Sequence, residues 1–285
     1  MPMKHRRISL SERRSRRYRI NYGFMFLKRF TILYAIEWAT YFNPLELTLD
    51  TIRDLKLYQN KKGYRFSVDA LLLYSFVNLR RAGHIADLGA GSGVIGLLLA
   101  RKYHDSTVTL IELQESLAGL AKKNAKLNSL DDRVAVIESN ITNIAAGRSP
   151  LLAKSFDLVV SNPPFRRQNT GLISPTDEKA IARHEIKLKI KDLIDASFYL
   201  LRAKGRLCII YHPSRLVELI DALRKKQLEP KRLRLVHSNT NTEAKMVLVE
   251  AIKEGKAEMK IEKPMYIYNE NGQYRDEMKQ LYRAY

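Results

Sequence analysis

The sequence has a single cysteine, Cys208, among its 285 residues, so no intramolecular disulfide can form and we expect a cytoplasmic location. Long apolar runs are also lacking. The aromatic-rich stretch 24–42 is interrupted by Lys28, Arg29 and Glu37, well short of the roughly 18–20 apolar residues of a membrane span. The six histidines and the lone cysteine show no metal-ligand spacing. We therefore expect neither a transmembrane helix nor a metal site.

Acidic residues are scarce relative to basic ones. The chain has 30 Asp and Glu against 50 Lys and Arg, a formal net charge of +20 and a pI near 9.9. A balance this basic indicates a polyanionic partner, usually nucleic acid and sometimes an anionic membrane surface. A solvated basic face without a specific ligand is the alternative, and we favour nucleic acid.

Much of the excess charge lies in the first 46 residues, which we define as the basic N-terminal arm. Such an Arg-rich, acid-poor segment is typical of a disordered tail that contacts RNA, and equally of an organelle transit peptide. An early start codon would also produce it, and part of the arm is compatible with a short helix packed on the main domain. We expect that main domain over residues 47–285.

From residue 84 onward, strand and helix patterns alternate. We predict strands over 84–88, 107–112, 134–138, 156–161 and 206–211, and helices over 94–102, 116–128, 189–202 and 214–226. This alternation is typical of an α/β fold with a doubly wound, mostly parallel, Rossmann-like sheet. Two final strands, 232–236 and 245–252, are joined without an obvious helix, so we expect one of them to run antiparallel at the sheet edge.

A glycine-rich turn, Gly89, Gly91 and Gly93, follows the first of these strands. Glycines there permit tight backbone geometry and the close approach of a ligand to the main chain. Glu112 ends the next strand, where a carboxylate accepts hydrogen bonds from ribose hydroxyls. Residues 91–96 also match the dinucleotide fingerprint G-x-G-x-x-G. The turn alone therefore does not separate a nicotinamide enzyme from an S-adenosylmethionine-dependent methyltransferase.

Asp87, at the strand end just before the first glycine, favours the methyltransferase. A carboxylate there pairs with a cationic amino group such as that of the methionine moiety of S-adenosylmethionine, whereas it would repel a pyrophosphate. The alternative role for Asp87 is to cap nearby backbone amides. We predict S-adenosylmethionine as the cofactor.

The segment Asn162-Pro163-Pro164-Phe165 follows the fourth strand, at the rim where open α/β sheets bind ligands. We predict that the Asn162 side-chain oxygen and the Pro163 main-chain oxygen accept the two hydrogens of an exocyclic amino group. These bonds strengthen as the nitrogen receives a methyl group, which stabilises the transition state. Phe165 would stack on an unpaired base. The alternative is a rigid turn with a buried aromatic side chain.

These motifs resemble those of class I S-adenosylmethionine-dependent methyltransferases with an Asn-Pro-Pro-aromatic motif. The segments Phe66–Leu73, Ala182–Glu185 and Pro264–Tyr268 are similar to the bacterial tRNA1(Val) adenine-37 N6-methyltransferase family. The resemblance covers roughly residues 47–285. It implies a class I methyltransferase sheet, N6 methylation of an adenine in tRNA, and RNA as the partner; we expect a monomer.

The resemblance also implies roles for individual residues. Asp69, Asp87 and Gly89, with Gly91 in the same turn, would lie at the methionine end of the cofactor, Glu112 at its ribose and Asn140 at its adenine. The family usually has Asp in place of Asn140, so we expect weaker but similar binding. Arg166 and Arg167 would contact phosphates that flank the target base, and ordinary surface arginines are an equal alternative. His184 is given no catalytic role, because it opens a predicted helix.

Several rival functions remain open on the sequence alone. The Asn-Pro-Pro-aromatic motif also serves methylation of guanine N2 in rRNA and of a protein glutamine amide. A nicotinamide-dependent oxidoreductase is disfavoured by Asp87 and by residues 162–165. A non-catalytic RNA-binding module that keeps the cofactor fold is disfavoured by Asn162.

Overall fold

A computed structural model describes residues 47–61, 68–163 and 189–283. The chain divides into two units, Met1–Leu47 and Thr48–Tyr285. All described residues except Leu47 belong to the second unit, whereas the basic N-terminal arm lies outside the described residues and stays a prediction. No helix in the described segments is long and apolar enough to cross a membrane.

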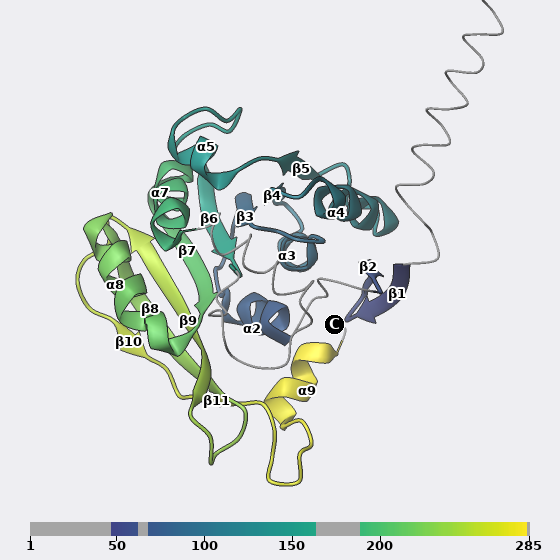
Figure 1. Cartoon of the computed structure of the whole chain (residues 1–285), viewed down its shortest axis with the longest axis vertical. Helices are drawn as coiled ribbons and strands as arrows, with labels where there is room; N and C mark the ends of the chain where they lie inside the picture. The colour runs from purple at the N-terminus through teal and green to yellow at the C-terminus, as the bar shows by residue number, and fades with distance from the viewer. Residues whose placement is uncertain (1–46, 62–67, 164–188, 284–285) are drawn as a thin grey trace, which may run out of the picture. The chain divides into compact units, whose positions relative to one another are not determined.

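The second unit alternates strands and helices over most of its length (Figure 1). The strands are β1 (Leu47–Ile52), β2 (Leu55–Asn60), β3 (His84–Leu88), β4 (Thr107–Glu112), β5 (Val134–Glu138), β6 (Phe156–Ser161), β7 (Leu201–Tyr211), β8 (Leu228–His237), β9 (Ala244–Lys253), β10 (Lys260–Ile261) and β11 (Met265–Tyr266). The helices are α2 (Val68–Phe76), α3 (Val94–Lys102), α4 (Glu115–Leu127), α5 (Ile141–Ala145), α7 (Ile190–Leu200), the 3₁₀ helix η2 (Pro213–Arg215), α8 (Leu216–Lys225) and α9 (Asp276–Tyr282).

The main sheet has the order β10-β8-β9-β7-β6-β3-β4-β5, with β11 beside β8. Pairing is parallel from β7 through β6, β3 and β4 to β5, which confirms the predicted doubly wound α/β fold. The predicted antiparallel strand is β9, but its position differs from the prediction. β9 lies between β7 and β8 and pairs antiparallel with both, so it is inside the sheet and not at the edge.

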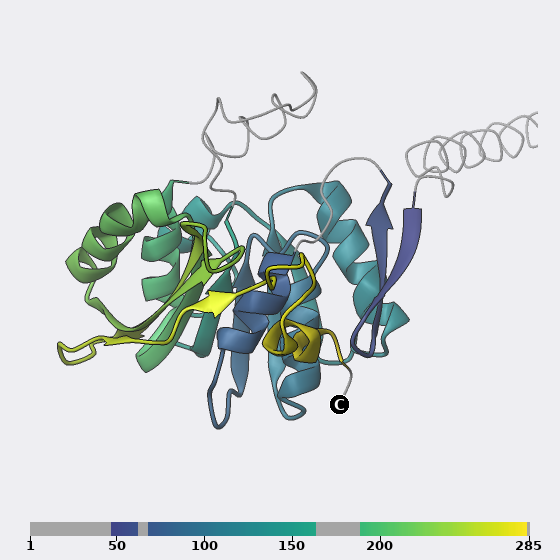
Figure 2. The same ribbon diagram turned by 90° about the horizontal axis from the view of Figure 1, so that it is seen from below.

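Both faces of the sheet are buried. Successive residues of a strand point to opposite faces, and the buried residues of the central strands alternate between two apolar clusters. One cluster includes Ile85, Val108, Leu110, Leu158, Val160, Cys208 and Ile210; the other includes Ala86, Leu88, Ile111, Val159, Leu207 and Ile209. The first packs against α2, α3 and α4, and the second against α5, α7 and α8. Figures 1 and 2 show these two helix groups on opposite sides of the sheet.

The junction between α7 and β7 departs from the predicted helix over 189–202. α7 ends at Leu200, and β7 begins directly at Leu201. Leu201 pairs with Phe156, and the next pair is Arg206 with Leu158, so the intervening residues form a bulge. Gly205 therefore lies within an irregular strand.

The hairpin of β1 and β2 is held on α4 by two asparagine side chains. Asn128 accepts a hydrogen bond from the Lys56 N–H and donates one to the Lys56 carbonyl, at 3.0 and 2.8 Å. Asn124 does the same with Tyr58, at 2.7 and 3.1 Å. Residues four apart on a helix share one face, as do alternate residues of a strand. The two amides therefore pair with β2 as a neighbouring strand would.

Candidate functional site

The predicted site residues lie where neighbouring parallel strands end. Gly89 follows β3, Glu112 is the last residue of β4, Asn140 lies just after β5 and Asn162 just after β6. These four strands are adjacent and parallel, in the order β6-β3-β4-β5, so their carboxyl ends share one edge of the sheet. In open α/β sheets, this edge is where ligands bind. The structure thus brings both motifs to one rim.

Asp87 is completely buried near the end of β3. Its Oδ2 accepts a hydrogen bond from the Gly96 N–H at 2.9 Å, whereas its Oδ1 has no hydrogen-bond partner among the described residues. Burial raises the pKa of Asp87 to about 7. The hydrogen bond from the Gly96 N–H lowers this pKa, and the negative charge of Glu112 raises it further. The predicted capping role is therefore present, and a second oxygen remains available for a cationic group.

Glycines in the turn and in the helix after it meet two separate geometric demands. Gly89 has a φ of +73°, which favours glycine, and apart from its chain neighbours no atom of the described residues lies within 4 Å of where its Cβ would be. Space for a ligand is thus left beside the main chain. Gly96, in the first turn of α3, has the opposite surroundings, because a Cβ there would collide with the Leu110 side chain of β4. It permits close packing of the helix on the sheet.

Glu112 is almost fully buried beneath this turn. Its Oε2 accepts a hydrogen bond from the Gly91 N–H at 2.8 Å, and its Oε1 accepts one from the Gln114 N–H at 2.9 Å. A carboxylate accepts up to about four hydrogen bonds, so both oxygens retain capacity for ribose hydroxyls. The carboxylate thus supports the turn and can also accept hydrogen bonds from a ligand.

Asn140 caps the short helix α5. Its side-chain oxygen accepts a hydrogen bond from the Thr142 N–H at 3.0 Å. Asparagine and aspartate cap helices about equally well, which gives a physical reason why Asn is compatible with this position. Asp69 lies in the first turn of α2, a helix that packs against α3.

The described part of the second motif ends at Pro163. Asn162 is half-buried and Pro163 is buried. Phe165, Arg166, Arg167 and His184 lie outside the described residues, so their predicted roles stay predictions.

A family model described as a methyltransferase small domain matches residues 66–223, more than half of the chain. The chain belongs to this family. The match spans both the glycine turn and the Asn-Pro-Pro segment, and it identifies the protein as a methyltransferase. The nicotinamide alternative is therefore wrong.

Relatives of this methyltransferase carry a consistent name. A protein of Porphyromonas gingivalis is 32% identical over 190 residues, which cover 65% of this chain and 73% of the relative. One of Dyadobacter fermentans is 24% identical over 231 residues, covering 80% and 92%. Both are named tRNA1(Val) (adenine(37)-N6)-methyltransferase. The resemblance seen in the sequence is confirmed.

Solved structures agree with the methyltransferase fold. A predicted O-methyltransferase, Atu636 of Agrobacterium tumefaciens, has a TM-score of 0.60 at 25% identity, covering 76% of this chain and 97% of that one. M. jannaschii TYW2 in complex with AdoMet has a TM-score of 0.50 at 17% identity, covering 73% and 85%. The class I methyltransferase fold is confirmed.

S-adenosylmethionine is the cofactor of this methyltransferase, and the residues present fit it. The Asp87 Oδ1 has no hydrogen-bond partner among the described residues, and the ionised carboxylate offers a buried negative charge for the cationic methionine amino group. The open space at Gly89 leaves room beside the main chain, and Glu112 lies at the end of the next strand. Which of these atoms contact the cofactor remains a prediction.

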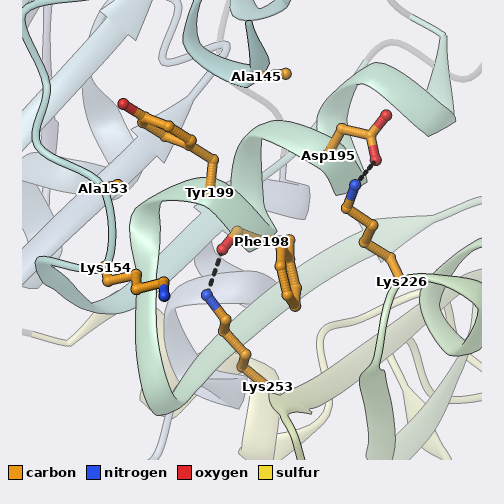
Figure 3. Close-up of a pocket in the computed structure, with 8 residues that line it drawn as sticks. All are labelled: Ala145, Ala153, Lys154, Asp195, Phe198, Tyr199, Lys226 and Lys253. Atoms are coloured by element: carbon orange, nitrogen blue, oxygen red, sulfur yellow. Dashed lines mark hydrogen bonds and ion pairs between the residues drawn. The ribbon is translucent and has the colours of Figure 1, made fainter. Parts of the chain in front are cut away.

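A cavity of ≈ 240 Å³ lies at a different place in the fold (Figure 3). It is lined by Ala145, Ala153, Lys154, Asp195, Phe198, Tyr199, Lys226 and Lys253. The buried Lys253 ammonium donates hydrogen bonds to the carbonyls of Phe198 and Leu201, both at 2.7 Å, at the C-terminal end of α7. Lys226 forms an ion pair with Asp195. Lys253 thus stabilises the C-terminal end of α7, and Lys226 stabilises the contact between α8 and α7. Both lie away from the methyltransferase rim.

Sequence reasoning missed two polar residues that support the rim. Ser161 ends β6 directly after the apolar run Leu158–Val160, and Asn124 lies among the buried residues of α4. In each case, a polar residue at a position expected to be apolar was the available signal. Their partners, Leu88 and Ser92, are distant in the sequence, so the pattern alone did not identify them.

Proposed function

We propose that this methyltransferase transfers the methyl group of S-adenosylmethionine to the N6 atom of an adenine in tRNA, of the tRNA1(Val) adenine-37 type. The observation that carries the proposal is the position of Asn162, at the end of β6 and beside the β3 rim that holds Asp87. The names of the relatives and the net charge of +20 support an RNA substrate.

The cofactor supplies an electrophilic methyl group on a sulfonium. Asn162 would accept one N6 hydrogen through its side-chain oxygen, and Pro163 would accept the other through its main-chain oxygen. Proline restricts the backbone, which keeps these acceptors oriented. The amino nitrogen becomes more acidic as it is methylated, so both bonds strengthen in the transition state. The sulfur would leave as a neutral thioether, and the methylated nitrogen would lose one proton to solvent water. No strong base is therefore needed, and positioning for in-line attack contributes the rest.

The proposal extends to the setting of the enzyme. A tRNA substrate fits a cytoplasmic, monomeric enzyme, and phosphate contacts from Arg166, Arg167 and the basic N-terminal arm would position the RNA.

Transfer of tritiated methyl groups tests the substrate. The purified protein is incubated with labelled S-adenosylmethionine and with total tRNA, rRNA or total protein, and the RNA is then digested to nucleosides. Label in N6-methyladenosine is expected. Label in N2-methylguanosine from rRNA, or in methylglutamine, would assign the enzyme to the corresponding alternative. Absence of label in every substrate would favour the non-catalytic RNA-binding module.

A further inference from the structure

A side-chain hydrogen bond joins the ends of β6 and β3. Ser161, the last residue of β6, is fully buried, and its hydroxyl donates to the Leu88 carbonyl at 2.7 Å. Leu88 is the last residue of β3. The backbone register between these strands extends from Ile85 and Leu158 as far as Asp87 and Val160. The hydroxyl bond therefore continues the connection one residue beyond the paired backbone.

The residues that follow this bond carry the two halves of the site. Asn162 comes directly after Ser161, and Gly89 comes directly after Leu88. Asn162 is the proposed binding group for the target amine, and Gly89 begins the turn proposed to lie beside the cofactor. β3 also contacts β4 on its other side, where the N–H groups of Gly89 and Ala90 donate to the Ile111 carbonyl. The glycine turn is therefore held on one side by β4, and on the other side it is linked to β6 through Ser161.

We infer that Ser161 is a positioning residue for methyl transfer: its bond to the Leu88 carbonyl sets the place of Asn162 relative to the cofactor turn. This inference rests on the proposed function. In-line transfer depends on the alignment of amine, methyl group and leaving sulfur, and a shift of about 1 Å reduces such rates by up to about 100-fold. A bond that connects the two halves therefore affects the rate more than it affects binding of either substrate.

Serine 197 provides a matched control for the loss of a buried hydroxyl. Ser197 is also fully buried, and its hydroxyl donates to the Leu193 carbonyl, again at 2.7 Å. That bond lies within α7 and connects no rim segments. Ser161→Ala and Ser197→Ala therefore each remove a buried hydroxyl that donates to a main-chain carbonyl over the same distance, one at the rim and one away from it.

The experiment measures kcat and KM for tRNA, Kd for S-adenosylmethionine, and Tm. For Ser161→Ala we expect kcat to fall about tenfold while both binding constants change less than about twofold. Ser197→Ala should lower Tm by a similar amount and leave kcat unchanged. An unchanged kcat in Ser161→Ala, or an equal loss in both variants, would overturn the inference.

Two checks keep the result interpretable. If Ser161→Ala does not fold, Ser161→Cys, which replaces the hydroxyl with a larger thiol that donates a weaker hydrogen bond, is measured against the same criteria. The wild-type protein is assayed in parallel. Inactivity of the wild type on tRNA would refute the proposed function, whereas an active wild type with an equally active Ser161→Ala would refute only the role of Ser161.

Discussion

The side-chain amide of Asn124 donates a hydrogen bond to the main-chain oxygen of Ser92 at 3.0 Å. Ser92 lies inside the glycine turn, whereas Asn124 lies on α4 and also pairs with Tyr58 of β2. Asn124 is fully buried, so these backbone groups depend on it in place of water. One amide thereby connects the β1–β2 hairpin, α4 and the glycine turn.

Replacement of this amide should affect stability and cofactor binding together. In Asn124→Ala, the buried backbone groups lose their partners, so the free energy of unfolding should fall by about 1–3 kcal/mol. The Kd for S-adenosylmethionine should rise, because the turn at Ser92 loses a support. Denaturant unfolding and calorimetric titration measure the two effects. Asn128→Ala is the control, since Asn128 binds Lys56 of the hairpin; it should lose stability only, and an equal loss of affinity would contradict the coupling.

Cofactor affinity should depend on pH through Asp87. Its pKa is about 7, and only the ionised carboxylate attracts the cationic amino group. The ionised fraction rises from roughly a tenth at pH 6 to roughly nine-tenths at pH 8, so affinity should increase about tenfold over this range. Titrations at several pH values measure it. Asp87→Asn should bind more weakly and show a flat profile; a slope that persists in this variant would assign the dependence to another group.

The same carboxyl group should affect the stability of the cofactor-free protein in the opposite direction. Its folded pKa is raised above the ordinary value of 3.8, so between about pH 4 and about pH 7 the unfolded chain binds fewer protons than the folded one. Stability from Asp87 is therefore complete below about pH 4 and declines as pH rises to about 7. Unfolding of wild type and Asp87→Asn across this range isolates the contribution, and a difference between them that does not vary with pH would rule it out.

Removal of the Asn162 amide should abolish most methyl transfer without loss of the fold. Asn162→Ala deletes one proposed acceptor of an N6 hydrogen, and loss of one such transition-state contact reduces kcat by about 10²–10³. Asn162 is half-buried and follows the strand, so Tm and the Kd for S-adenosylmethionine should change little. Native-rate methylation of tRNA by this variant would refute the proposed role.

A buried carboxylate on β9 should matter for stability alone. Glu250 is almost fully buried and accepts hydrogen bonds from Arg206 at 2.7 Å and Arg232 at 2.8 Å. Glu250→Ala leaves partly buried guanidinium groups without this partner, so the free energy of unfolding should fall by about 3 kcal/mol. The exposed Asp221–Lys225 pair is the control, and Asp221→Ala should cost less than about 1 kcal/mol. Comparable losses in the two variants would show that burial is not decisive.

The basic N-terminal arm should contribute to RNA affinity. Deletion of residues 1–40 removes a concentration of Lys and Arg, so tRNA binding should weaken at low salt and its dependence on salt should become less steep. Binding of S-adenosylmethionine should be unaffected, which serves as the internal control. An RNA affinity that is unchanged across a salt series would exclude the arm as a contact.

The predicted bounds of β3, β4, β5 and β6 match the structure residue for residue. Short apolar runs bounded by turn residues are local signals, and so is the helix that follows a glycine turn. The start of β7 was missed, because the bulge before Arg206 exists only through pairing with β6. The interior position of β9 was missed for the same kind of reason, since its two partners are chosen by packing over long distances in the chain.

The sequence by itself determined the alternating α/β pattern, the family, and the residue types that the chemistry needs at the ends of β3, β4 and β6. Each of these depends on local spacing or on residue identity. Only the tertiary structure decided that Asp87 has a raised pKa and an oxygen without a partner in the described part of the chain, and that Ser161 and Asn124 support the rim through Leu88 and Ser92. Burial and hydrogen-bond partners arise when distant segments pack together, and no local pattern records which segments meet.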